Sequence, residues 1–157
     1  GWDITDYFYG DPAALSSDAK TNLDRWCALS RSEPARLSFP GVTIPEAEHV
    51  AARLTTDHNV DLVVDALFGI GLARPIDGLR PIVERINAAH RAQGNAARPL
   101  RVVSVDVPSG IAEHGPLSAD DHAALYADLT VTFHALKTSH IEAPDHCGRV
   151  VVVDIGL

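Results

Sequence analysis

The chain has 157 residues, of which 46% are hydrophobic and 22% are charged, and this length is sufficient for one domain with a substantial core. The formal net charge of −8 argues against a broad surface for nucleic acid or anionic membranes. No apolar run approaches the roughly 20 residues of a membrane-spanning helix. The two cysteines, Cys27 and Cys147, form no motif, so we expect reduced thiols and a cytoplasmic protein.

The first third of the chain predicts two strands and two helices. Trp2–Tyr9 alternates loosely and is rich in aromatic and β-branched residues, which indicates a strand. Ser16–Ala28 begins with candidate serine caps and has apolar residues on one helical face. A short strand is expected at Arg36–Phe39. Thr43 and Glu46 form a capping box that opens the second helix.

The rest of the chain alternates between strand and helix patterns. Strands are predicted at 60–68, 100–107, 128–133 and 149–155, and helices at 79–92 and 120–126. A polar loop is expected at 111–121 and a long connection at 134–148. This alternation indicates βαβ units with right-handed crossovers. The predicted fold is therefore an α/β three-layer sandwich with a Rossmann-like, mostly parallel sheet, in a single domain over 1–157.

Two of the predicted strands end in a carboxylate and a turn. Asp106 ends one apolar run and Asp65 ends the other. Because open α/β sheets bind ligands outside the carboxyl ends of their strands, the two carboxylates are predicted to share one site. On spacing alone, an aspartate that only caps the following turn has equal weight. Lys137 follows a third strand and is predicted to lie at the same edge of the sheet, with an ordinary exposed lysine as the alternative.

Other motifs are weaker. Gly69-Ile70-Gly71 follows a strand as a phosphate-binding loop does, but no helix follows it, so the dinucleotide-binding fingerprint of a dehydrogenase is not met. A structural turn, with a solvated Arg74 after it, is the simpler interpretation of this stretch alone. The residues around Ser109 do not make the Gly-x-Ser-x-Gly motif of a hydrolase nucleophile, and we interpret Ser109 as an oxygen ligand or turn former. The spacing of three histidines does not fit a structural zinc site, and they are expected at the surface: His134, His140 and His146.

Four segments together carry a specific resemblance. They read, in chain order, VDALFGIGLARPIDG, VDVPSG, ADLTVTFHALK and GRVVVVDIG. In this combination they resemble the YjeF N-terminal-domain family, the NAD(P)H-hydrate epimerases, and the likeness extends over nearly the whole chain. The resemblance implies a Rossmann-like fold and an isomerase that interconverts the R and S epimers of hydrated NADH and NADPH. An S-specific NAD(P)H-hydrate dehydratase, separate or fused, would be the functional partner.

The resemblance also implies roles for individual residues. Asp106 would be the catalytic acid that contacts the substrate. From general principles, burial would raise the pKa of Asp106, and a potassium ion between the two aspartates would oppose that rise. Asp65 and Ser109 would be ligands of a potassium ion, a hard cation that suits oxygen ligands. The substrate loop would consist of Gly69, Ile70, Gly71, Leu72, Ala73, Arg74 and Pro75.

The chain departs from the family pattern in two places. The family's Asn-Asn-Gly-Gly-Asp-Gly loop is absent from these residues, so we expect an amino-terminally truncated domain. Ile70 stands where the family usually has a threonine. The family's first helices and first strand are missing from these residues too. Loss of that strand would expose a sheet edge and apolar surface, which predicts a homodimer. The missing loop leaves open an alternative function, a non-catalytic module of the same fold that binds a ligand or a partner in a scaffold or an RNA-processing protein.

Overall fold

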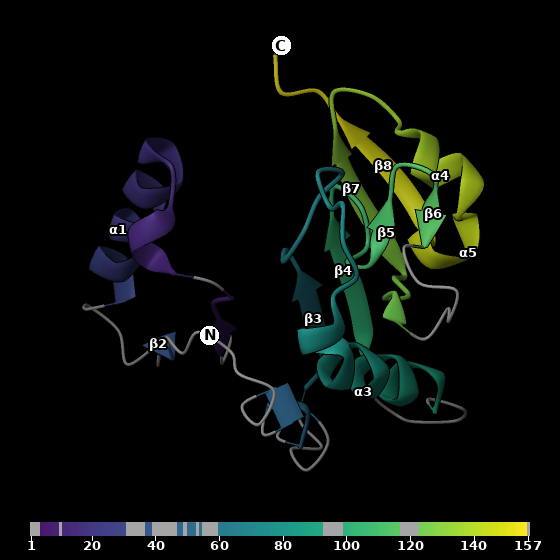
Figure 1. Ribbon diagram of the computed structural model, residues 1–157, viewed down its shortest axis with the longest axis horizontal. Helices are drawn as coiled ribbons and strands as arrows, with labels where there is room; N and C mark the ends of the chain where they lie inside the picture. The colour runs from purple at the N-terminus through teal and green to yellow at the C-terminus, as the bar shows by residue number, and fades with distance from the viewer. Residues whose placement is uncertain are drawn as a thin grey trace. The chain divides into compact units, whose positions relative to one another are not determined.

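The computed structural model describes residues 4–9, 11–30, 37–38, 47–48, 50–52, 54, 60–92, 99–116 and 123–156 (Figure 1). The chain divides into two compact units, Gly1–Glu46 and Ala47–Leu157. The single domain over 1–157 stays a prediction.

Among its described residues, the unit Gly1–Glu46 has a short parallel strand pair and one α-helix. Strand β1 (Asp6–Tyr7) pairs in parallel with β2 (Leu37–Ser38). Between them lie the 3-10 turn Pro12–Ala14 and helix α1 (Ser17–Ser30). The side chain of Asp11 accepts the backbone N–H of Ala13 at 2.8 Å and so caps the turn. The strand predicted over 2–9 is thus shorter in the described residues, and the proposed capping box at 43 and 46 lies outside them.

The unit Ala47–Leu157 is built on a parallel sheet. Its described strands are β3 (Leu62–Asp65), β4 (Arg101–Val105), β7 (Leu129–Phe133) and β8 (Arg149–Val153), in the order β3-β4-β7-β8. Every neighbouring pair in this sheet is parallel. With the helices that connect the strands, this arrangement confirms the predicted α/β, Rossmann-like fold. No helix among the residues that the structure describes is long and apolar enough to cross a membrane.

Helices fill most of the connections between these strands. Helix α3 (Arg80–Arg91) follows a 3-10 turn at Asp77–Leu79 and carries Pro81 in its first turn, as predicted. The long connection predicted at 134–148 is instead largely helical, with α4 (Thr138–Glu142) and α5 (Pro144–Cys147). The predicted loop at 111–121 begins with a hairpin of β5 (Ile111–Ala112) and β6 (Gly115–Pro116). Of the predicted helix at 120–126, the described residues 123–126 are not α-helical.

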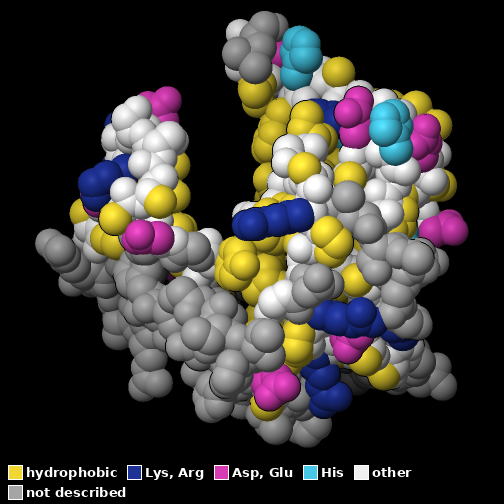
Figure 2. All heavy atoms as spheres, viewed as in Figure 1, with side chains coloured by type: hydrophobic (Ala, Val, Ile, Leu, Met, Phe, Trp, Pro, Cys, Tyr) yellow, Lys and Arg dark blue, Asp and Glu magenta, His cyan; other side chains and the backbone are white. Residues whose placement is uncertain are grey.

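The two faces of the parallel sheet differ in burial. Each connection moves one strand further in the same direction, so right-handed crossovers place the connecting segments on one face. That face is the core, and its fully buried residues include Val102, Ser104, Thr130 and Thr132. On the opposite face, Leu62 and Val64 remain 42% and 58% exposed. Figure 2 shows hydrophobic side chains (yellow) gathered along the side of this unit on which β3 lies.

A buried polar side chain, Asn87, fixes helix α3 against the rest of the core. Its Nδ2 donates to the carbonyl of Ala124 at 2.8 Å, and its Oδ1 accepts the backbone N–H of Tyr126 at 3.0 Å. The apolar residues Ile82, Val83 and Ile86 of the same helix are buried as the periodicity predicts. The nitrogen and the oxygen of the Asn87 side-chain amide therefore both have hydrogen-bond partners, and these bonds hold the segment before β7 in a defined position.

Candidate active site

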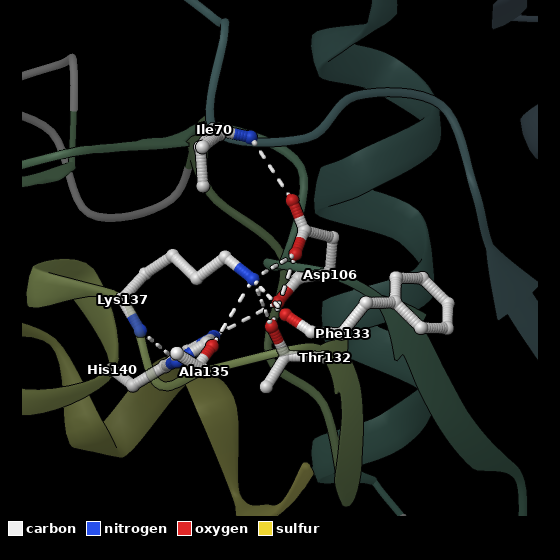
Figure 3. A network of polar contacts seen from close by, with 7 residues as sticks. All are labelled: Ile70, Asp106, Thr132, Phe133, Ala135, Lys137 and His140. Atoms are coloured by element: carbon white, nitrogen blue, oxygen red, sulfur yellow. Dashed lines mark hydrogen bonds and ion pairs between the residues drawn. The ribbon is translucent and has the colours of Figure 1, made fainter. Parts of the chain in front are cut away.

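Asp106 lies immediately after strand β4, at the carboxyl edge of the sheet. Its backbone N–H donates to the carbonyl of Val131 at 2.8 Å, which ties it to β7. Its φ is 70°, in the left-handed region that residues other than glycine rarely adopt. The side chain leaves the strand between two groups of partners, Lys137 and Thr132 on one side and Ile70 on the other (Figure 3).

One carboxylate oxygen of Asp106 belongs to an ion pair. Oδ1 lies 3.0 Å from Nζ of Lys137 and accepts the hydroxyl of Thr132 at 3.0 Å. Lys137 Nζ also donates to the Thr132 hydroxyl oxygen at 2.8 Å and to the carbonyls of Phe133 and Ala135 at 2.7 and 3.1 Å. The ammonium is thus surrounded by oxygen atoms, and the prediction that Lys137 lies at the edge with Asp106 is confirmed.

This environment decides the charge of Asp106. Burial raises the pKa of its carboxyl group, but hydrogen bonds from Lys137 and Thr132 and the positive charge of Lys137 outweigh burial and lower the pKa below its ordinary value. The expected effect of burial on the pKa of Asp106 is confirmed, but Lys137 and Thr132 reverse the net direction. The distance between Lys137 and Asp106 depends on the tertiary structure and could not be predicted from local pattern. Asp106 is a carboxylate at neutral pH.

The second carboxylate oxygen faces the glycine loop. Oδ2 lies 3.5 Å from the backbone N–H of Ile70, and a Cβ placed on Gly69 would lie 3.0 Å from Oδ2. A glycine at position 69 therefore allows the loop to approach the carboxylate closely. Past this contact the loop turns, with the N–H of Leu72 donating to the carbonyl of Gly69 at 3.2 Å. Leu72 is buried, whereas the exposed residues of the loop are Ile70, Gly71, Ala73, Arg74 and Pro75.

Asp65, at the end of β3, has its own set of partners. It accepts the Ser109 hydroxyl at 2.6 Å, the Ser109 N–H at 2.8 Å, the Ser104 hydroxyl at 3.0 Å and the Leu67 N–H at 3.3 Å. Asp65 and Ser109 are both buried. Asp65 thus fixes the turn after β4 to the end of β3, and its contact with the Leu67 N–H lies in the turn that follows Asp65 itself.

The turn that carries Ser109 is packed on its other side as well. The N–H of Leu125 donates to the carbonyl of Ser109 at 2.9 Å. Gly110 has a φ of 96°, and a Cβ at this position would lie 2.5 Å from the carbonyl oxygen of Ala123. Only glycine fits this conformation and this space. The turn after Asp106 is therefore held rigidly, which limits the positions that the carboxylate can take.

The two carboxylates lie at the same edge of the sheet. Register pairs Asp65 with Ser104, two residues before Asp106 on the neighbouring strand. Asp65 binds the turn at Ser109, whereas Asp106 binds Lys137, Thr132 and the glycine loop. The predicted common edge is confirmed, and a shared ligand between the two carboxylates stays a prediction.

Two histidines that were predicted to lie at the surface are buried. His140 and His146 are 6% and 5% exposed, not at the surface, and each lies within hydrogen-bond distance of a backbone carbonyl. Thr132 was also missed as a partner of Asp106. The sequence LTVTF has a threonine at every second position, which places both threonines on the same face of the strand. Thr130 and Thr132 are buried on that face, and both hydroxyls donate hydrogen bonds. This alternation could have indicated a buried polar partner for a neighbouring strand, because buried hydroxyls need hydrogen bonds.

The parallel sheet, the strand-end carboxylate and the glycine loop define a Rossmann-like α/β domain with a candidate active site at the carboxyl edge of its strands. The family described as YjeF-related protein N-terminus matches residues 1–139. The chain belongs to this family.

Curated relatives extend over the whole chain. It is 44% identical over 158 residues to an NAD(P)H-hydrate epimerase of Roseobacter litoralis and 34% identical over 157 residues to one of Rhodobacter capsulatus, with 100% of this chain covered in both cases. It spans 66% and 62% of those two proteins. It is also 33% identical to a bifunctional NAD(P)H-hydrate repair enzyme Nnr of Thermofilum pendens, over 92% of this chain and 24% of that protein.

Proposed function

We propose that the protein carrying this chain is an NAD(P)H-hydrate epimerase, an isomerase that interconverts the R and S epimers of hydrated NADH and NADPH. The observation that carries the proposal is the Asp106 carboxylate, held by Lys137 and Thr132 with one oxygen toward the glycine loop. The names of two relatives that match the whole chain support the same activity. Substrate would lie against the loop Gly69–Pro75, with Asp106 as the catalytic residue.

The charge of Asp106 favours a particular chemical role. Epimerisation at the hydrated carbon requires the bond from that carbon to oxygen, or a bond of the ring, to break and to form again on the other face. In the first route the hydroxyl group takes a proton from solvent and leaves as water, so that positive charge develops on the ring; a water molecule then adds to the other face and releases a proton to solvent. A carboxylate with a lowered pKa is a weak base but stabilises adjacent positive charge well. Oδ2, the oxygen toward the glycine loop, would face the ring.

A potassium ion fits the donor set at Asp65 and Ser109. Both side chains offer oxygen atoms, both are buried, and they are in direct contact. A hydroxyl oxygen that donates its proton to a carboxylate keeps lone pairs for a cation. We propose these two residues as ligands. The ion would supply positive charge that attracts the substrate phosphates, while Asp65 continues to hold the turn at Ser109.

Assembly and partners follow from the exposed sheet face and from the chemistry. Leu62 and Val64 lie on a largely apolar face that stable domains cover. We propose that a second copy covers it in a homodimer.

An S-specific NAD(P)H-hydrate dehydratase would consume the product. We place the reaction in the cytoplasm, where the buried thiol of Cys147 stays reduced.

The test is the rate of epimerisation. The natural full-length protein is mixed with the R epimer of hydrated NADH and an excess of an S-specific dehydratase, so that NADH forms only as fast as R converts to S. We expect the rate to exceed spontaneous epimerisation in proportion to the protein added. Binding of the hydrate without acceleration would instead support the non-catalytic ligand-binding module. Absence of both binding and acceleration would reject the epimerase and the hydrate-binding module alike.

A further inference from the structure

His140, in the first turn of helix α4, is bonded at both ring nitrogens. The backbone N–H of Lys137 lies 3.0 Å from Nδ1, and Nε2 lies 2.8 Å from the backbone carbonyl of Asp106. A backbone N–H can only donate and a carbonyl oxygen can only accept. Nδ1 must therefore carry the lone pair and Nε2 the proton. The neutral Nε2–H tautomer satisfies both partners at once.

These two bonds reach both members of the ion pair at the candidate site. One holds the backbone of Lys137, whose ammonium lies 3.0 Å from Oδ1 of Asp106. The other holds the backbone of Asp106 itself. Asp106 needs this support because its φ of 70° is unfavourable for a residue with a Cβ. Figure 3 shows His140 beside the start of α4, with Lys137 reaching back toward Asp106.

We propose that His140 is a positioning residue that sets the separation between the Lys137 ammonium and the Asp106 carboxylate. Its imidazole ties the start of α4 to the residue after β4, two segments that are 34 positions apart in the sequence. The effect on turnover rests on the proposed epimerase function, whereas the effect on the ion pair does not. His140 acts through Asp106 and Lys137.

The first measurement is the tautomer of His140 in the natural full-length protein. Nitrogen-15 NMR of the histidine ring distinguishes a protonated Nε2 from a protonated Nδ1. We expect the His140 signals of the Nε2–H form at neutral pH. A protonated Nδ1 would overturn the proposal, because that nitrogen then could not accept the Lys137 N–H.

The second measurement compares variants of His140. In His140→Ala both links are lost, so we expect the carboxyl pKa of Asp106, followed by carbon-13 NMR, to rise as Lys137 moves away. The epimerisation kcat should fall by about tenfold or more, with a smaller change in KM. His140→Gln places an amide N–H near the position of Nε2 and should recover part of both properties. If His140→Ala does not fold, His140→Gln is the variant in which the pKa of Asp106 and kcat are measured.

The matched control is His146→Ala. His146 is equally buried, but its Nδ1 lies 3.1 Å from the Leu125 carbonyl and its ring stacks on Tyr126. This variant should lose thermal stability while the pKa of Asp106 and kcat stay at parent values. If His140→Ala behaves in the same way, His140 is merely structural and the proposal is wrong. If the parent protein does not epimerise the hydrate, the function fails, and the tautomer and the Asp106 titration still decide the positioning role.

Discussion

The ammonium of Lys137 and the carboxylate of Asp106 form an ion pair with 3.0 Å between Nζ and Oδ1. The two oxygens of the Asp106 carboxylate therefore have different surroundings. Oδ1 has the charged partner and the Thr132 hydroxyl, whereas the contact given for Oδ2 among the described residues is that to the Ile70 N–H, at 3.5 Å. This asymmetry orients Asp106 toward the glycine loop before any substrate binds.

The first prediction concerns Lys137→Met. Asp106 stays buried in this variant, and burial raises its pKa. The hydrogen bond and the positive charge of Lys137, which lower the pKa in the parent, are absent, so the pKa of Asp106 should rise. Carbon-13 NMR titration of the carboxyl group measures this change. Lys20→Met is the control, because Lys20 pairs with Asp24 in a fully different, exposed setting with side chains 58% and 66% accessible. An Asp106 pKa that does not move in Lys137→Met contradicts the ion pair.

The same variant should change the response of stability to acid. In the parent, the folded pKa of Asp106 lies below its ordinary value of 3.8. A carboxyl group whose pKa is lower in the folded state than in the unfolded state stabilises the fold at pH values above the unfolded pKa. This stabilisation is lost as the pH falls through the folded pKa. Urea unfolding from pH 6 to pH 2 should therefore show a shallower acid-dependent loss in Lys137→Met than in the parent. A loss of equal steepness would mean that other carboxylates, such as Asp128, account for the acid response.

The second prediction compares two glycines of the loop. Gly69→Ala places a Cβ 3.0 Å from Oδ2 of Asp106, so the loop or the carboxylate must shift. We expect kcat/KM for epimerisation to fall by roughly 10- to 100-fold. Gly71→Ala is the matched control, since a Cβ there meets nothing within 4 Å. Equal effects of the two substitutions would show that the loop, rather than its approach to Asp106, sets the rate.

The third prediction concerns potassium. If Asp65 and Ser109 bind the ion, the melting temperature should be higher in potassium chloride than in tetramethylammonium chloride at matched ionic strength. Asp65→Asn should abolish the difference. It should also lower stability by at least about 2 kcal/mol, because an amide replaces a buried carboxylate that accepts four hydrogen bonds. Identical melting curves of the parent in the two salts would rule out the ion site.

The fourth prediction concerns the exposed sheet face. Val64, 58% exposed on β3, should lie in the interface of the proposed homodimer. Val64→Glu should convert a dimer to a monomer in analytical ultracentrifugation, because a buried unpaired carboxylate is costly. Ile141→Glu is the control, since Ile141 is 71% exposed on α4, away from the sheet. A parent that sediments as a monomer at every concentration contradicts the homodimer.

The fold and part of the site could be predicted because they depend on local pattern. The apolar run before Asp106 and the period of α3 specify strand and helix directly, and strands at one edge bring Asp65 and Asp106 to adjacent positions. The ion pair depends instead on where the chain after β7 returns. Lys137 and His140 reach Asp106 from more than 30 residues away. No local pattern encodes that return, so the direction of the Asp106 pKa and the burial of His140 were beyond sequence reasoning.

The last prediction concerns catalysis by Asp106 itself. Asp106→Asn keeps the shape of the side chain and removes its negative charge, so it removes both the stabilisation of a positively charged ring and any acceptance of a proton. Turnover should fall by roughly 10²–10⁴-fold, as for the loss of a general acid–base group. The fold should persist, because the Asp106 backbone bonds to Val131 and His140 do not involve the carboxylate. Circular dichroism and thermal melting check this.

The assay is dehydratase-coupled epimerisation in the natural full-length protein, with the spontaneous rate subtracted. Asp65→Asn should differ from Asp106→Asn by weakening substrate binding, so that KM rises more than kcat falls. If the parent accelerates epimerisation and Asp106→Asn is equally fast, Asp106 is not catalytic. Lys137 then becomes the candidate, because its ammonium is the charged group next to Asp106 and can donate a proton where the carboxylate cannot. Loss of activity in Lys137→Met with full activity in Asp106→Asn would establish that exchange of roles.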